Sequence, residues 1–238
     1  MIRTIYAYIS IVLSLVLSII PLGIYILIKR FISEKSRESF VYTITYIWGK
    51  WMVFLSGSKI TVIGKENLPE ENVLFVGNHQ SYYDIPLLLA FIGRQLGFVA
   101  KIEMTKVPVM RTWMKEMSCI FLDRSNTRQS LKTILKGIEY LKSGKNLVLF
   151  PEGTRSKNGI LGEFKPGSLK LGTKAEVPIV PITIVGSGNM YEYPGKRFTP
   201  NNTKIIIHNP IYPKCLNKEQ QNNLTDTIRQ IIQQPLLK

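Results

Sequence analysis

The sequence contains very few of the residues from which disulfide and metal sites are built. Among its 238 residues there are two cysteines, Cys119 and Cys215, and two histidines, His79 and His208. Two cysteines exclude a disulfide scaffold and a cysteine-based zinc module. We therefore expect no metal and no cofactor, and any histidine chemistry has only two positions. We interpret His208 as the end of a strand, which leaves His79 as the candidate.

Acidic residues are also scarce. Asp and Glu number 16 against 31 Lys and Arg, which gives a formal net charge of +15 and a pI near 9.8. Such an excess predicts anionic partners: nucleic acid, an acidic membrane surface or phosphorylated substrates. No recognised nucleic-acid-binding motif accompanies the charge, so we expect no nucleic acid. Hydrophobic residues make up 45% of the chain, which excludes a disordered chain.

A long stretch near the amino terminus lacks charge altogether. No charged residue occurs from Thr4 to Ile28, and a helix of that length exceeds a hydrocarbon core of about 30 Å. The run is too long for a signal peptide, and a buried helix of a soluble protein is the weaker alternative. Lys29 and Arg30 follow it, so the positive-inside rule places the next segment in the cytoplasm. Pro21 predicts a bend, which leaves open whether the segment spans the bilayer or enters one leaflet.

A second apolar stretch, Phe40–Ser56, carries Lys50 as its sole charge and is rich in Tyr and Trp. These residue types settle at headgroup depth, which favours a helix lying in the membrane interface. A core helix of the globular part is the alternative. Together the two stretches predict a membrane-associated helical hairpin over residues 1–57, followed by a cytosolic domain over residues 58–238.

From Gly57 onward short apolar runs alternate with helical periods. Helices are expected at Gln129–Lys142, capped by Asn126 or Thr127, and at Asn217–Gln233. Several strand candidates are apolar throughout, which is typical of strands buried on both faces. The pattern predicts an α/β fold with a mixed, largely parallel sheet flanked by helices. The expected strands are Lys59–Ile63, Val73–Val76, Gly97–Ala100, Cys119–Leu122, Leu147–Phe150, Ile179–Val185 and Lys204–His208.

Polar clusters follow three of these strands, where ligand sites of α/β sheets gather. One cluster contains His79 and Asp84. The two side chains can meet if His79 lies in a turn and Asp84 begins the next helix, since on one ideal helix they would point apart. An imidazole held by a carboxylate is a general base. The chain has no Gly-x-Ser-x-Gly elbow, so the base would act directly on a substrate alcohol. The alternative is a capped histidine in a polar turn.

The other two clusters carry arginines. Arg124 and Arg155, with Lys101 nearby in the sequence, are cations suited to a phosphate. Backbone N–H groups of Gly153 and Thr154 can donate to the same anion. The alternative is that these arginines form ordinary surface ion pairs.

Four motifs in order resemble those of the glycerolipid acyltransferases. The stretch 78–84 resembles their His-x4-Asp motif, and 121–124, 150–156 and 177–181 resemble the second, third and fourth motifs. Within the family the similarity is to the bacterial 1-acylglycerol-3-phosphate acyltransferases. The family often has a glycine a few residues before the second motif, where this chain has Met117-Ser118. We interpret that departure as a local loop difference.

The resemblance implies acyl transfer to the sn-2 hydroxyl of 1-acylglycerol 3-phosphate (lysophosphatidic acid), giving phosphatidic acid. The donor would be an acyl thioester, either acyl carrier protein or acyl-CoA. His79 would deprotonate the hydroxyl, and Asp84 would orient His79. Arg124 and Arg155, aided by Lys101, would hold the acceptor phosphate, with Gly153 and Thr154 beside them. Glu152 would position glycerol or lock the arginines.

Three other functions compete with this one. The first is a related acyltransferase that acts on another lysophospholipid or on a glycerol phosphate. The second is a membrane-bound lipid hydrolase in which His79 activates water. The third is a nonenzymatic module that binds anionic membrane lipids through its charge of +15.

Overall fold

A seven-stranded sheet forms the centre of the protein. The computed structural model describes residues 2–123, 125–156 and 159–237. The strand order is β1-β7-β6-β2-β5-β3-β4, and only the β6–β7 pair is antiparallel. The expected mixed, largely parallel sheet is confirmed. The strands are β1 (Lys59–Ile63), β2 (Leu74–Gly77), β3 (Gly97–Lys101), β4 (Ile120–Leu122), β5 (Leu147–Leu149), β6 (Ile179–Val185) and β7 (Asn202–Ile207).

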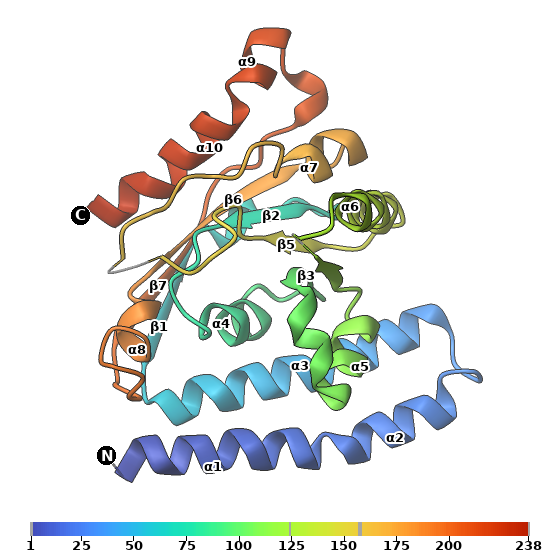
Figure 1. The fold of residues 1–238 in the computed structure, drawn as a ribbon, viewed down its shortest axis with the longest axis vertical. Helices are drawn as coiled ribbons and strands as arrows, with labels where there is room; N and C mark the ends of the chain where they lie inside the picture. Colours follow the sequence, from blue (N-terminus) through green and yellow to red (C-terminus); the bar gives the residue numbers. More distant parts are fainter. Residues whose placement is uncertain (1, 124, 157–158, 238) are drawn as a thin grey trace.

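Strand β2 lies in the middle of the sheet and is buried on both faces, as its apolar sequence predicts. Val73 and Phe75 belong to one hydrophobic cluster, and Leu74 and Val76 belong to another. In Figure 1 one face of the sheet is covered by α3, α4 and α5, and the other by α6, α7 and α10. These helices are α3 (Glu34–Ser56), α4 (Asp84–Phe91), α5 (Pro108–Glu116), α6 (Thr127–Lys142), α7 (Lys170–Ala175) and α10 (Leu224–Gln233).

The helix ends follow local capping signals. Asn126 caps α6, where its side chain accepts a hydrogen bond from the backbone N–H of Gln129. The helix expected at Asn217–Gln233 is instead two helices, α9 (Lys218–Asn222) and α10. Asn217 caps α9 in a reciprocal capping box, and the break falls at Asn223, a residue type that favours helix ends. A short helix α8 (Ser187–Met190) follows β6.

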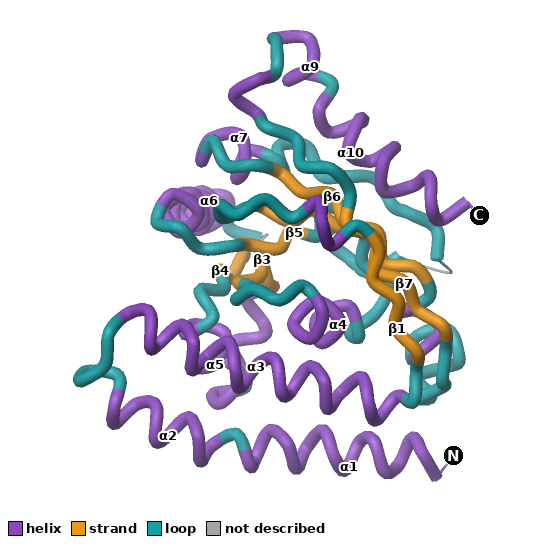
Figure 2. Tube along the Cα trace, turned by 180° about the vertical axis from the view of Figure 1, so that it is seen from behind, coloured by secondary structure: helices purple, strands orange, loops and turns teal. Residues whose placement is uncertain are grey.

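The amino-terminal segment forms α1 (Ile2–Leu17) and α2 (Ile19–Ile28), which run antiparallel to α3 (Figures 1 and 2). The interruption lies at Ser18, one turn before Pro21. Because proline lacks an N–H group, it cannot bond to the Leu17 carbonyl, and its ring crowds that same carbonyl. The predicted effect of Pro21 is thus confirmed and located at Ser18.

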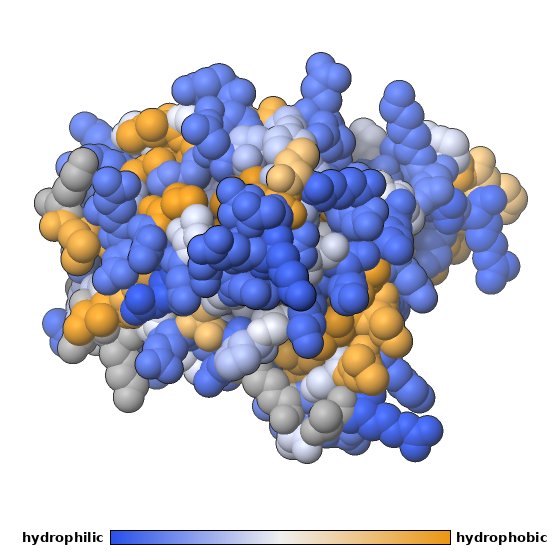
Figure 3. Space-filling view, turned by 90° about the horizontal axis from the view of Figure 1, so that it is seen from above, coloured by the Kyte–Doolittle hydropathy of each residue, from blue (hydrophilic) through white to orange (hydrophobic). Residues whose placement is uncertain are grey.

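Helices α1 and α2 are largely uncovered. Among the described residues one segment, Arg3–Ile28, is long and apolar enough to cross a membrane, and only 11% of its most apolar stretch is buried. Val12 and Ile20, for example, are 63% and 64% exposed. These values argue against the buried helix of a soluble protein. The surface seen from the side of α9 and α10 is, by contrast, mostly hydrophilic (Figure 3).

Helix α3 combines the two alternatives left open by its sequence. Val41, Gly49 and Met52 are buried, and Gly49 faces α4, whereas Trp51 and Phe54 are exposed. One hydrophobic cluster includes residues of α1, α2 and α3 together with β2. A domain division at residue 57 stays a prediction, since the helices and the sheet share this cluster.

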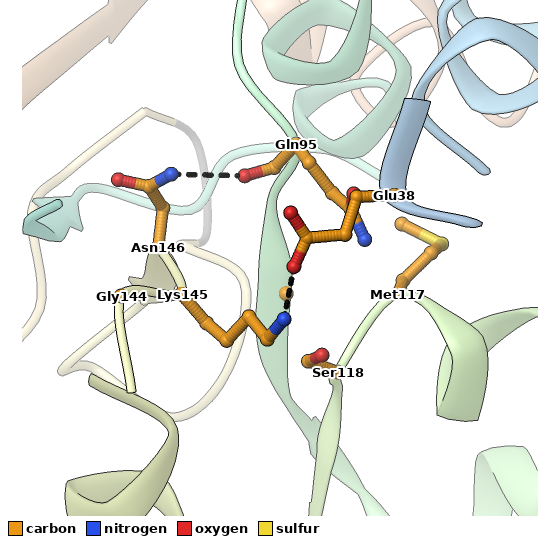
Figure 4. Close-up of a pocket in the computed structure, with 8 residues that line it drawn as sticks. Glu38, Gln95, Met117, Ser118, Gly144, Lys145 and Asn146 are labelled. Atoms are coloured by element: carbon orange, nitrogen blue, oxygen red, sulfur yellow. Dashed lines mark hydrogen bonds and ion pairs between the residues drawn. The ribbon is translucent and has the colours of Figure 1, made fainter. Parts of the chain in front are cut away.

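Two charged contacts fix the helical layer to the rest of the chain. Lys29, at the end of α2, forms an ion pair with Glu116 of α5 at 2.8 Å. Lys145 pairs with Glu34 and Glu38 of α3, beside a small pocket at the amino ends of β3 and β5 (Figure 4). That pocket lies at the sheet edge opposite to the carboxyl ends of these strands. The two ion pairs of Lys145 beside it connect α3 to the loop before β5.

Ser118, which precedes the second motif, has a left-handed backbone conformation. Its φ is +62°, so the turn between α5 and β4 requires the left-handed conformation. Glycine adopts this conformation without steric cost, whereas other residues adopt it with strain. In this chain serine occupies the same left-handed turn.

The close packing of α3 on α4 predicts a stability effect at Gly49. A Cβ atom there would lie 2.8 Å from the carbonyl oxygen of Pro86. We expect Gly49→Ala to lower the free energy of unfolding by about 1–3 kcal/mol through overpacking. Gly23→Ala in α2 is the matched control, because no heavy atom lies within 4 Å of its added methyl group. Thermal unfolding in detergent measures both, and equal melting temperatures for the two variants would contradict the packing argument.

Candidate active site

His79 and Asp84 meet at the carboxyl end of β2. His79 lies in the turn after the strand and Asp84 is the first residue of α4, as the spacing predicts. The distance between His79 Nδ1 and Asp84 Oδ2 is 2.7 Å. The same carboxylate oxygen accepts hydrogen bonds from the backbone N–H groups of Gln80 and Ser81, at 2.7 and 2.9 Å. Asp84 is fully buried, so three donors converge on one buried oxygen.

The imidazole ring of His79 is held from two sides. Its plane stacks on the ring of Phe150, with centroids 4.2 Å apart and an angle of 12° between the planes. The Asp84 carboxylate only accepts hydrogen bonds, so Nδ1 donates to it. Within the part of the chain that the structure describes, Nε2 has no hydrogen-bond partner, and the side chain is 19% exposed. A neutral His79 can therefore accept a proton at Nε2.

Glu152 joins the loop after β5 to the loop after β2. Its Oε1 accepts a hydrogen bond from the backbone N–H of His79 at 2.8 Å, and its Oε2 accepts one from that of Gly162 at 2.7 Å. Burial raises the pKa of the Glu152 carboxyl, while these two N–H groups act to lower it. Ser156 N–H also donates to the His79 carbonyl, at 2.6 Å. Glu152 thus fixes the backbone of the histidine.

Asn78 and Gln80 fasten the same loop to β6. Asn78 exchanges two hydrogen bonds of 2.8 Å with the backbone of Ile184. Gln80 Oε1 accepts hydrogen bonds from Gly186 N–H at 3.2 Å and from the Ser187 hydroxyl at 3.3 Å. The turn that carries His79 is therefore bound to both strands that flank β2.

Arg155 lies beside this turn. Its guanidinium covers the ring of Tyr82, with Cζ 3.6 Å from the ring centroid. Its Nη1 is 3.1 Å from Oε1 of Glu192, which also accepts a hydrogen bond from Tyr82 N–H. Arg155 thus forms an ion pair, as the alternative interpretation from the sequence expected. Its side chain is only 33% exposed, so the pair is partly buried. A cation consequently sits next to the histidine loop.

The remaining candidates lie at the same edge of the sheet or outside the described residues. Lys101 ends β3 and is exposed, Gly153 has a φ of +72° in the turn after Glu152, and Thr154 is exposed. Arg124 lies outside the described residues. Since β3 and β4 follow β5 outward in the sheet, the second-motif cluster lies farther from β2 than the third-motif cluster does.

Comparison with known proteins agrees with this arrangement. The family model described as Acyltransferase matches residues 59–185, which is more than half of the chain. The chain belongs to the acyltransferase family. It is 32% identical to the "Probable 1-acyl-sn-glycerol-3-phosphate acyltransferase" of Mycoplasma pneumoniae, over 93% of this chain and 90% of that protein. The protein of the same name from Mycoplasma genitalium is 36% identical, over 81% of this chain and 74% of that protein.

A solved structure extends the similarity to nearly the whole chain. The crystal structure of the 1-acyl-sn-glycerophosphate (LPA) acyltransferase PlsC from Thermotoga maritima superposes with a TM-score of 0.84 at 30% sequence identity. The match covers 99% of this chain and 94% of that one, so it includes the amino-terminal helices. The fold predicted from the sequence is therefore shared with a solved acyltransferase.

The sequence assigned no role to two side chains of this candidate site. Phe150, which stacks on His79, was identified as the first residue of the third motif but not as a contact of the histidine. Glu192 contacts Tyr82 and Arg155 from a segment beyond the fourth motif. No motif marks Glu192, and only the position of its segment at the carboxyl end of β6 could have suggested it.

The contacts of Glu152 predict the effect of Glu152→Gln. Both carboxylate oxygens accept from backbone N–H groups, and an amide would set an NH2 group against one of them. We expect a loss of about 1–3 kcal/mol in stability from the unpaired buried donors. We also expect turnover to fall at least tenfold, because the backbone of His79 is released.

Thermal unfolding and steady-state kinetics of the acyltransferase reaction measure these two effects. Glu163→Gln, at an exposed carboxylate in the neighbouring sequence, is the control. Full activity and unchanged stability in Glu152→Gln would contradict the positioning role.

Proposed function

We propose that this protein transfers a fatty acyl group from an acyl thioester to the sn-2 hydroxyl of 1-acylglycerol 3-phosphate, giving phosphatidic acid. The observation that carries the proposal is the contact of 2.7 Å between His79 Nδ1 and Asp84 Oδ2. The loop that carries His79 lies beside Arg155, a cation suited to the acceptor phosphate. The names of the two Mycoplasma relatives, which are probable 1-acyl-sn-glycerol-3-phosphate acyltransferases, support the choice of acceptor.

In the proposed reaction His79 Nε2 takes the proton of the acceptor hydroxyl as its oxygen attacks the thioester carbonyl. Asp84 stabilises the imidazolium that forms, since its carboxylate already accepts the Nδ1 proton in a hydrogen bond. When the carbon–sulfur bond breaks, the imidazolium returns a proton to the leaving thiolate. The new ester bond then replaces the thioester, and no covalent enzyme intermediate forms. General-base catalysis of this kind contributes about 10²–10⁴ in rate.

The acceptor phosphate would be bound by cations at the same sheet edge. Arg155 is the central one and Lys101 is a further candidate. Arg124 lies outside the described residues, and its role stays a prediction from the sequence. Thr154 lies in the turn between Glu152 and Arg155, where its backbone N–H can donate to an anion. The N–H of Gly153 instead donates to the carbonyl of Phe150 at 3.0 Å, so the role expected for it as an anion donor is not supported.

The uncovered surface of α1 and α2 supports a membrane location for the reaction. We propose that these helices enter the bilayer with the catalytic domain on the cytoplasmic side. Anionic lipids would then neutralise part of the net charge of +15. Both the acceptor and the product carry acyl chains, so a site close to the bilayer avoids moving them through water.

A panel of acceptors and donors tests the proposed reaction. Purified protein in lipid vesicles would be assayed with lysophosphatidic acid, other lysophospholipids and glycerol 3-phosphate, each with acyl carrier protein thioester and with acyl-CoA. We expect the highest kcat/KM with lysophosphatidic acid. Preference for another acceptor would replace the proposed substrate, and release of free fatty acid independent of any acceptor would identify a hydrolase.

Two substitutions test the roles of His79 and Asp84. We expect His79→Ala to abolish turnover, because no other described histidine reaches the site. Asp84 accepts its three hydrogen bonds through Oδ2, and its Oδ1 has no partner among the described residues. In Asp84→Asn the amide oxygen can take the place of Oδ2 and the NH2 group that of Oδ1, so the three hydrogen bonds can be kept. It removes the charge that stabilises the imidazolium, so we expect kcat to fall by about 10²–10⁴.

Membrane association of both variants should equal that of the unsubstituted protein in a vesicle flotation assay. This readout separates the enzyme from a nonenzymatic lipid-binding module, for which His79→Ala would leave the function intact. Retention of full turnover by His79→Ala would refute the general base.

A charge on the exposed face of α2 tests the membrane location. Ile20 is 64% exposed, and an arginine near the centre of a membrane helix costs about 2.5–3.5 kcal/mol. We expect Ile20→Arg to reduce the vesicle-bound fraction. Ile160→Arg is the matched control, since Ile160 is 74% exposed but lies outside the amino-terminal helices. Equal binding by the two variants would show that α2 does not enter the bilayer.

A further inference from the structure

Glu192 brings together three parts of the site that are distant in the sequence. Its Oε1 lies 3.1 Å from the backbone N of Tyr82 and 3.1 Å from Nη1 of Arg155. Its Oε2 accepts a short hydrogen bond from the hydroxyl of Ser81. The residue itself comes from the segment after α8. One carboxylate thus connects the loop after β2, the loop after β5 and the segment that follows β6.

The contacts of Arg155 leave most of its hydrogen-bonding capacity unused. Stacking on Tyr82 sets the plane of the guanidinium, and the bond to Glu192 sets its rotation within that plane. Among the residues that the structure describes, the hydrogen bond of Arg155 is made through Nη1 alone. The other N–H groups of the guanidinium remain available to a phosphate, which a planar fork binds in a bidentate manner.

We propose that Glu192 is a positioning residue that aligns Arg155 for the phosphate of the acceptor. The inference rests on the proposed function, in which Arg155 binds that phosphate. Glu192 acts through Arg155 and takes no part in the proton transfer at His79.

A carboxylate beside Arg155 could instead compete with the phosphate for the guanidinium. The geometry favours alignment, because two of the three donors to Glu192 do not belong to Arg155. The Ser81 hydroxyl and the Tyr82 N–H would keep the carboxylate in place when a phosphate binds. The side chain of Glu192 is also only 17% exposed, so it has little room to move away.

Steady-state kinetics of Glu192→Gln and Glu192→Ala test the proposal. Glutamine keeps the size and one acceptor oxygen but removes the charge, and alanine removes all three contacts. We expect the KM for the acceptor to rise about tenfold in Glu192→Ala and less in Glu192→Gln. In Glu192→Gln, which keeps the size of the side chain and one acceptor oxygen, the kcat and the KM for the acyl donor should stay within about twofold. Glu70→Gln, at an exposed carboxylate before the amino end of β2, is the control and should leave all constants unchanged.

A double-mutant cycle with Arg155→Ala separates alignment from a general structural role. If Glu192 acts through Arg155, Glu192→Gln should have no further effect on the acceptor KM in the Arg155→Ala background. The same fold-change in both backgrounds would overturn the proposal. A lower acceptor KM in Glu192→Gln would also overturn it, because a competing carboxylate would then have been removed.

The two proposals fail separately. The acceptor panel on the unsubstituted protein tests the reaction, whereas the cycle can be run with any phosphate-bearing acceptor that the protein turns over. Thermal unfolding of each variant in detergent shows whether the protein remains folded. Should Glu192→Ala not fold, the isosteric Glu192→Gln decides through the same cycle.

Discussion

The geometry of the site depends on one buried oxygen of Asp84. Its three hydrogen bonds close the turn from His79 and fix both the ring nitrogen of the histidine and the first residue of α4. A buried carboxylate without partners is costly, so the loop has few conformations other than the one that supplies all three donors. The start of α4 in turn sets the face that packs on α3 around Gly49. The position of the candidate base and the packing of the helical layer are therefore parts of one constraint.

The surrounding contacts make this turn rigid mainly through the backbone. Glu152 accepts from the His79 N–H, Asn78 exchanges two hydrogen bonds with Ile184, and Ser156 donates to the His79 carbonyl. These contacts are possible because β2 lies between β5 and β6 in a parallel arrangement, so the three carboxyl ends meet at one edge. A rigid loop of this kind holds the histidine without using its Nε2 atom. In the proposed reaction this atom stays free for proton transfer.

Much of the fold could be predicted from the sequence because its signals are local. The apolar runs of β2 and β5, the cap at Asn126 and the proline at position 21 each act over a few residues. The pairing of His79 with Asp84 was also predictable, since turn and helix start are neighbours in the chain. Glu192 was not, because its partners are distant in the sequence and depend on the order of the strands. The break at Asn223 was missed because the segment before it, Lys218–Asn222, contains no apolar residue. Without apolar spacing, the sequence does not show where one helix ends and the next begins.

The segment that carries Glu192 also contacts the apolar helices. The hydroxyl of Tyr191 lies 2.6 Å from that of Tyr8 in α1, and the rings of both pack against Phe198. Two consecutive residues therefore face opposite partners: Tyr191 binds the apolar helix and Glu192 binds the arginine of the site. In the proposed reaction the acceptor has its acyl chain in the bilayer and its phosphate at Arg155. A short connection between α1 and Arg155 then fixes the height of the phosphate-binding cation above the apolar surface. Because that height also sets where the sn-2 hydroxyl lies relative to His79, the depth of α1 and the position of the reacting hydroxyl are determined together.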